Sequence, residues 1–243
     1  MNEWFTEIKA KFILDFIEKE RWRYIVDGLK ITLEVTFLAL IFGLILGAVV
    51  AIIRTSHDQL KGEQAKSVRG FLLNVANGIC RVYLTIIRGT PTLVQLLLMF
   101  FVFMVSSNSK VLVAVITFGV NSGAYVAEIF RSGIQSVDRG QMEAGRSLGL
   151  GYVDTMTQII MPQAVKNCLP SLVNEMITLL KETSICGYIG LSELTRGGDI
   201  IRAGTFDALL PLLVVAVIYL VIVMFFTWIM SKLEGRLRES DRH

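Results

Sequence analysis

Long apolar stretches, separated by short polar or glycine-rich segments, dominate the sequence. A helix needs about 20 predominantly apolar residues to cross a hydrocarbon core of about 30 Å. Stretches of that length predict membrane spans at residues 31–53, within 68–105, at 111–130, at 154–180 and at 208–230. We therefore predict an all-α integral membrane protein with five transmembrane helices.

The second apolar stretch is interrupted by Arg81, Arg88, Gly89 and Pro91. Proline has no N–H to donate, and it disfavours helical geometry in the residue before it. We therefore predict a break or kink in this span near Thr90. Such a break is either structural or a place where unwound backbone exposes polar groups to a transported solute.

The beginning of the chain differs from the apolar spans. Residues 1–27 place aromatic side chains such as Phe12 and Phe16 at helical spacing among charged residues. This pattern predicts an amphipathic helix that lies on a membrane face or packs against the protein's own flank. A transmembrane domain is then expected over residues 28–231, followed by a basic tail over residues 232–243.

The loops predict the orientation of the chain. Residues 185–207 contain too many glycines for a full crossing and are expected to form a re-entrant or gating segment. Basic residues follow the first span, in loop 54–69 with Lys61 and Lys66, and the last span. The positive-inside rule therefore predicts a cytoplasmic C-terminus, and counting the spans back from it places the N-terminus outside.

Composition excludes several classes of protein. With 53% hydrophobic residues, the chain is too apolar for a soluble domain. The three cysteines form no C-x-x-C pair and the two histidines are isolated, so neither a metal site nor a disulfide framework is expected. The net charge of +3 is spread over the loops and does not indicate nucleic acid as a partner. No G-x-x-x-x-G-K-[ST] nucleotide loop occurs, so ATP hydrolysis by that mechanism is excluded.

Polar side chains on the third span predict a translocation pathway. Asn121, Tyr125 and Glu128 share one helical face, which must contact protein or a water-filled cavity. Alternatively, Glu128 lies at the cytoplasmic interface beside Arg131. The full set of predicted pathway residues is Thr90, Pro91, Gln95, Asn121, Ser122, Tyr125, Glu128, Asn174, Thr178, Lys181 and Thr183.

The polar segment between the third and fourth spans has a distinct pattern. Residues 143–148 favour a helix, Gly149 and Gly151 end it, and Asp154 with Thr155 can N-cap a second helix. A short helix that projects from a bilayer can dock into a cleft of another protein and pass a rotation into the neighbouring spans. An ordinary connector between two membrane helices is the alternative.

The spacing of this segment resembles the cytoplasmic EAA loop of ABC-importer permeases, usually written E-A-A-x3-G-x9-I-x-L-P. The chain differs from it at Gly145, where alanine is usual, and at Met161, where leucine is usual. Both positions keep a small or an apolar side chain. The residues that follow, Pro162-Gln163-Ala164, Pro170 and Asn174, resemble the polar amino acid subfamily of those permeases.

The resemblance covers nearly all of the chain and implies the fold of a type I ABC importer permease. It also implies roles for the loop: Glu143 would begin the coupling helix, Ala144 and Gly145 would keep its surface small, and Gly149 would close it. The ATPase-coupling residues implied in this way are Glu143, Ala144, Gly145, Leu148, Gly149 and Pro162.

The same resemblance implies the partners and the location of the chain. The partners would be ABC ATPase subunits that hold ATP and Mg²⁺, a second permease copy or homologue, a substrate-binding protein outside the cell or in the periplasm, and the lipid bilayer. The chain itself would bind no cofactor, would not be an enzyme, and would be a multi-pass protein of the bacterial inner (cytoplasmic) membrane. The substrate would be a polar amino acid of the histidine, glutamine, arginine or cystine type.

Other functions stay open at this point. Within the transporter class, the alternatives are a peptide, methionine or a metal complex as the solute. Outside it, an ion channel or secondary carrier would need no coupling loop, and a membrane enzyme would need a nucleophile–base or metal constellation that the sequence does not show.

Overall fold

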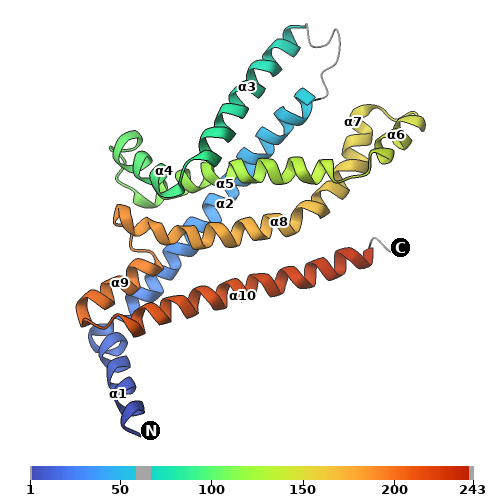
Figure 1. The fold of residues 1–243 in the computed structure, drawn as a ribbon. Coiled ribbons are helices and arrows are strands. Elements are labelled where there is room, and N and C mark those ends of the chain that lie inside the picture. The colour runs from blue at the N-terminus through green and yellow to red at the C-terminus, as the bar shows by residue number, and fades with distance from the viewer. Residues whose placement is uncertain (1, 59–66, 241–243) are drawn as a thin grey trace.

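The computed structural model describes residues 2–58 and 67–240, with the side chains of 2–5, 8 and 236–240 left out. Lys61 and Lys66 of the predicted basic loop therefore lie outside the described residues. The described parts are helical and contain no strand, so the predicted fold class is confirmed (Figure 1). The α-helices are α1 Asn2–Phe12, α2 Trp22–Asp58, α3 Val68–Gly89, α4 Thr92–Leu98, α5 Lys110–Gln135, α6 Arg139–Ser147, α7 Tyr152–Thr155, α8 Met161–Glu182, α9 Leu194–Thr205 and α10 Leu209–Ser240. Short π or 3₁₀ turns form η1 Ile13–Ile17, η2 Glu18–Glu20, η4 Met99–Phe103, η5 Met156–Ile160 and η6 Thr183–Ile189.

Four helices of the described chain, α2, α3, α5 and α10, are long and apolar enough to cross a membrane. Helix α8 has 22 residues and is therefore also long enough, but it is more polar than the other four. The predicted count of five spans depends on α8 and stays a prediction.

The centre of the fold is the crossing of α2 and α5, which form the most extensive helix pair. Glycines on both helices make this contact possible. A Cβ atom on Gly43 would lie 3.0 Å from the Ser122 Cβ, and one on Gly47 would lie 2.6 Å from a Val126 methyl group. Small residues spaced four apart let two helix backbones approach closely in a membrane, which explains the Gly43-x-x-x-Gly47 motif.

A buried cluster fixes α4, α8 and η6 against this central pair. It contains Val35 from α2, Leu96 from α4, Phe118 from α5, Leu179 from α8 and Ile189 from η6. Phe118 and Leu96 are fully buried. The packing of these large side chains, each from a different element, holds the domain together.

The second apolar stretch differs from the expected single kinked span. Helix α3 ends at Gly89 after 22 residues, and α4 begins at Thr92 as a separate short helix. The predicted break near Thr90 is therefore confirmed, but α3 alone has the length of a span. Figure 1 shows α3 inclined away from α5 and α8, with α4 turning back beside α5.

The segment expected to be re-entrant forms η6, a turn at Gly190 and the short helix α9. With 12 residues, α9 is only about 18 Å long and cannot cross the bilayer. It packs closely on the start of α2, because a Cβ on Gly28 would lie 2.7 Å from the Glu193 carbonyl oxygen. Glu193 is buried, and its carboxylate accepts hydrogen bonds from the backbone N–H groups of Thr195 and Arg196 in the first turn of α9.

The N-terminal segment bends sharply where it meets α2. Lys19 and Glu20 have φ angles of 56° and 53°. Phe16 is buried in a cluster with residues of α9 and α10, so this residue packs against the protein's own flank. Phe12 is 47% exposed and remains available to a membrane surface. Helix α2 begins at Trp22, inside the N-terminal region proposed as residues 1–27.

Candidate functional site

Helix α6 forms the first part of the predicted coupling segment. The Asp138 carboxylate caps its N-terminus by accepting a hydrogen bond of 2.6 Å from the Gly140 N–H. At the other end, the Leu150 N–H donates to the Gly145 carbonyl and the Gly149 N–H donates to the Arg146 carbonyl, at 3.1 Å and 3.0 Å. This is the Schellman motif, which requires a left-handed residue, and Gly149 has a φ of +87°. The prediction that Gly149 ends the helix is therefore confirmed.

The start of the second helix differs from the prediction. Gly151, and neither Asp154 nor Thr155, is the N-cap of α7. Helical geometry begins at Tyr152, so the Thr155 hydroxyl lies inside the helix and donates 2.9 Å back to the Gly151 carbonyl. Asp154 instead lies in the first turn, where its negative charge is favourable near the helix N-terminus.

The two short helices present an apolar tip to the surroundings. Leu148 is 82% exposed and Val153 is 67% exposed, and Glu143 and Ala144 are also exposed. Gly145 is buried, and a Cβ there would lie 2.6 Å from the Thr155 methyl group. Its small size therefore serves the contact between α6 and α7, which differs from the expectation that it keeps the outer surface of α6 small.

A continuous helical path leads from this tip into the membrane domain. The π turn η5 joins α7 to α8, and Pro162 lies in the first turn of α8. Proline lacks an N–H and its ring crowds the preceding turn, so a local widening of the helix immediately before it is expected. Val137, Ile160 and Ala164 are buried here and pack the coupling segment against the end of α5.

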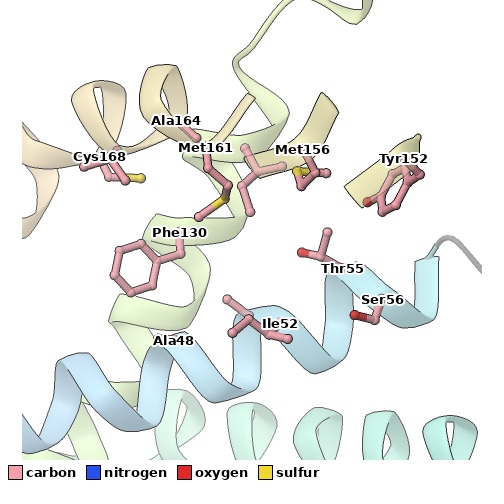
Figure 2. Close-up of a pocket in the computed structure, with 13 residues that line it drawn as sticks. Ala48, Ile52, Thr55, Ser56, Phe130, Tyr152, Met156, Met161, Ala164 and Cys168 are labelled. Atoms are coloured by element: carbon pink, nitrogen blue, oxygen red, sulfur yellow. The ribbon is translucent and has the colours of Figure 1, made fainter. Parts of the chain in front are cut away.

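A cavity of about 330 Å³ separates this segment from α2 and α5. Figure 2 shows Tyr152, Met156 and Met161 on one side of the cavity, facing Ile52 of α2 and Phe130 of α5. The lining is apolar apart from hydroxyl groups and a thiol.

The break after α3 carries a hydrogen-bond network. Pro91 cannot donate to the Ile87 carbonyl, four residues before it, and the Gln95 side-chain amide donates to that carbonyl instead at 2.8 Å. The same amide nitrogen donates to the Thr90 hydroxyl and carbonyl oxygens. Asn121 of α5 donates 2.9 Å to the Gln95 side-chain oxygen and thus ties the break to the central helix.

A second polar cluster surrounds Glu128. Its carboxylate accepts from Arg54 of α2 at 2.6 Å and from Arg131 at 2.9 Å. Arg88 of α3 lies 3.8 Å from the carboxylate and places its guanidinium 5.7 Å from the centre of the Tyr125 ring. One acidic side chain thus joins three helices, which goes beyond the predicted pairing with Arg131 at an interface.

The remaining predicted pathway residues lie apart from these two clusters. Asn174, Thr178 and Lys181 are exposed on α8. Thr183 is buried, and its hydroxyl donates 2.7 Å to the Leu180 carbonyl. Ser122 is fully buried at the crossing with α2, next to Gly43.

The prediction missed polar residues on α3. Arg81 and Thr85 line a pocket with Arg54, Arg88 and Glu128. The signal was present in the sequence, because Arg81, Thr85 and Arg88 are spaced i, i+4 and i+7 and so share one face of a helix. Arg54 had no such signal, since only the fold brings it to Glu128.

Comparisons with known proteins agree with this architecture. Residues 71–239 match the family model described as "Binding-protein-dependent transport system inner membrane component". The chain is 34% identical over 230 residues to the putative glutamine transport system permease protein GlnP of Rickettsia typhi, covering 93% of this chain and 98% of the relative. It is 36% identical over 221 residues to the arginine transport system permease protein ArtQ of Bacillus subtilis, covering 90% and 94%.

Solved structures have the same fold. A chain of an amino acid ABC transporter solved with histidines has 39% sequence identity and a TM-score of 0.77, over 88% of this chain and 94% of that one. The MetNI methionine ABC transporter, at 19% identity and a TM-score of 0.72 over 90% and 98%, shows the fold alone. The chain therefore belongs to the binding-protein-dependent inner membrane components, and it is the permease of an ABC importer, in which a separate ATPase subunit hydrolyses ATP.

Proposed function

We propose that this permease carries a polar amino acid, which it receives from a separate extracellular or periplasmic binding protein. The support is similarity along almost the whole chain to permeases named for glutamine and arginine. A solved relative is an amino acid ABC transporter at 39% identity. A permease for another small solute, such as a peptide, methionine or a metal complex, is the alternative.

The energy enters through residues 143–162, which dock on an ABC ATPase that holds ATP and Mg²⁺. The observation that carries this proposal is the tip of α6, where Leu148 is 82% exposed directly before the left-handed Gly149. Glu143, Ala144 and Leu148 supply the docking surface, and Gly149 fixes its end. Gly145 and Pro162 do not belong to the docking surface. Gly145 allows α6 to pack closely on α7, and Pro162 lies in the first turn of α8.

The docking end faces the cytoplasm of a bacterial cell. Figure 1 shows α6 and α7 at the same end of the molecule as the C-terminal end of α10, with α1 and α9 at the other end. The basic residues after α10 favour that end as the cytoplasmic one, which leaves the N-terminus outside. Two permease subunits, identical or homologous, enclose the pathway, because one such unit is too small to do so alone.

The residues predicted for the pathway divide into two roles. Thr90, Pro91 and Tyr125 lie at or beside the break and the arginine cluster, where a solute can contact them, and Glu128 holds the arginines of that cluster in place. Gln95 and Asn121 hold the break in place, and Ser122 packs at the helix crossing. Asn174, Thr178, Lys181 and Thr183 form a polar face of the α8 and η6 segment that completes the pathway.

The docking proposal is tested by Leu148→Glu and Gly149→Val in the assembled transporter. A buried charge at the tip, or a β-branched residue where φ is +87°, disrupts the docking surface. We expect at least a tenfold loss of uptake and loss of the ATPase during purification, with normal membrane insertion. Val105→Glu is the control, because Val105 is 71% exposed in the loop before α5, away from the tip. Retained ATPase and uptake in both tip variants would refute the docking role.

The substrate proposal is tested in liposomes that contain ATP, with a panel of amino acids and candidate binding proteins. We expect uptake of one or more polar amino acids that needs both ATP and a binding protein. Flux without ATP would instead indicate a channel or secondary carrier. ATP-dependent uptake confined to methionine or a peptide would favour the alternative substrates.

A further inference from the structure

A pocket of about 500 Å³ between α2, α3 and α5 contains more positively than negatively charged side chains. Arg54, Arg81 and Arg88 line it, together with Thr85 and the carboxylate of Glu128. Arg131 bonds the same carboxylate from the next turn of α5. Three guanidinium groups therefore lie within 4 Å of a single carboxylate, and a fourth, that of Arg81, lines the same pocket.

Glu128 does not have free capacity for all of these groups. One of its oxygens accepts from Arg54 and the other accepts from Arg131 through two guanidinium nitrogens, at 2.6 Å, 3.1 Å and 2.9 Å. Arg88 is 3.8 Å from the carboxylate, beyond hydrogen-bond distance. Arg81 is exposed and forms no ion pair within the described parts of the chain.

Arginine cannot relieve such crowding by losing its proton, because the guanidinium group stays protonated in proteins. Like charges that lie close together repel one another, so the excess of positive charge in the pocket favours an anion. The planar guanidinium presents paired N–H groups that match the two oxygens of a carboxylate. Arg81 and Arg88 form no hydrogen bond to Glu128, so their guanidinium donors can turn to such a ligand.

The pocket does not lie on the apolar face of α3. Exposed Phe71, Val75, Ile79 and Val82 share a separate face of this helix, which suits lipid. The pocket side adjoins Tyr125, whose ring Arg88 approaches, and Gly89 at the helix break. It is therefore continuous with the residues proposed for the pathway.

We propose that this pocket is a carboxylate-binding subsite on the translocation pathway, with Arg81 and Arg88 as the groups that contact the ligand. Its excess of positive charge favours acidic amino acids first, neutral zwitterions next and cationic amino acids least. This inference rests on the proposed transport of amino acids. Glu128 acts as a positioning residue that holds Arg54 and Arg131 in place.

Cysteine labelling of the assembled transporter in nanodiscs tests the charge of the pocket. Thr85→Cys places a thiol on the pocket wall, and the native Cys80, Cys168 and Cys186 are buried. We expect an anionic methanethiosulfonate to react at least about tenfold faster than a cationic one, relative to the same ratio at Ser106→Cys in an exposed loop. Adding Arg81→Gln or Arg88→Gln lowers the ratio, and labelling after denaturation shows whether equal amounts of protein are present.

The ligand is tested by protection of Thr85→Cys with L-glutamate, L-glutamine, L-arginine or inorganic phosphate at millimolar concentration. We expect glutamate to protect best and arginine least, with Arg81→Gln abolishing the difference. A ratio no higher than at Ser106→Cys, or best protection by arginine, overturns the subsite. Protection by phosphate alone overturns the assignment to a carboxylate. The labelling does not depend on transport, so it separates failure of the subsite from failure of the proposed function, which the liposome assay reports.

Discussion

Helices α5 and α10 are both candidate spans, yet they occupy opposite environments. In its most apolar stretch, 61% of the residues of α5 are buried within the protein, against 11% for α10. Helix α10 is nevertheless the more apolar of the two and contains no charged residue over positions 209–231. Among the four candidate spans of the described residues, the most hydrophobic helix is therefore the least buried one.

The difference follows from the solvent. Lipid tails are as apolar as leucine, so burying a large apolar side chain between helices gains little over leaving it in lipid. Close packing and hydrogen bonds decide which helix lies at the centre, and α5 supplies both through Gly119, Gly123 and Asn121. Exposed residues of α10, such as Leu213 and Phe225, need only lipid around them.

The largest expected effect is at the glycine contact of α5 with α2. Gly47→Val places a branched side chain where a Cβ alone would lie 2.6 Å from Val126 and 2.9 Å from the Ala127 nitrogen. We expect a loss of more than about 3 kcal/mol and little folded protein in a detergent thermal-shift or size-exclusion assay. Gly235→Val on α10 is the control, because a Cβ there meets nothing within 4 Å. If Gly47→Val and Gly235→Val gave equal amounts of folded protein, close packing would not explain why α5 lies at the centre of the protein.

Removing the same aromatic ring from each helix gives a direct test. Phe118→Ala on α5 leaves a cavity where the side chain is fully buried, and we expect a loss of about 3 kcal/mol, at the low end for buried aromatics because lipid replaces water as the reference. Phe225→Ala on α10 removes a ring that is 54% exposed, so less than about 0.5 kcal/mol should be lost. Thermal midpoints measured in one detergent decide between this outcome and equal losses.

The hydrogen-bond network at the break gives an intermediate effect. Gln95→Leu keeps the volume but leaves the Ile87 carbonyl without its donor, which should cost about 2 kcal/mol. Asn121→Leu removes a single bond to Gln95 and should cost about 1 kcal/mol. The double variant should lose less than the sum, since the two side chains share one network. Additive losses would show that Asn121 does not support Gln95.

The smallest effect is expected near the start of α10, where the N-terminal segment packs. Burial raises the pKa of the Asp15 carboxyl, and the nearby Thr205 hydroxyl offsets only part of this rise. A raised pKa in the folded state means that docking of this segment is strongest at low pH and weakens as pH rises through that pKa. Asp15→Asn should remove the pH dependence and gain about 1 kcal/mol or less at pH 7.

Limited proteolysis of residues 9–21 between pH 4 and 8 measures that docking. The wild-type segment should become easier to cleave as pH rises, whereas Asp15→Asn should not. Asp27→Asn is the control, because the Asp27 side chain is 65% exposed in a surface pair with Lys30. A pH dependence that survives in Asp15→Asn would assign it to another group.

Sequence alone determined the membrane class, the break at Pro91 and the glycine that closes α6. Each of these depends on a local property: a run of apolar residues, a missing N–H, or a backbone angle that only glycine adopts readily. The polar face of Arg81, Thr85 and Arg88 could also have been predicted from helical spacing. The N-cap of α7 could not, because Gly151 and Asp154 are both compatible with a helix start.

Only the tertiary structure decided what the polar side chains contact. Asn121 and Glu128 lie on the same helix two turns apart, yet one supports the break beyond α3 and the other gathers arginines from α2, α3 and α5. Gly145 likewise was expected on the outer surface of α6, but it is buried against Thr155. Sequence spacing fixes which residues share a helical face, but which partner that face meets depends on how helices distant in the sequence cross, and that is set by packing between them.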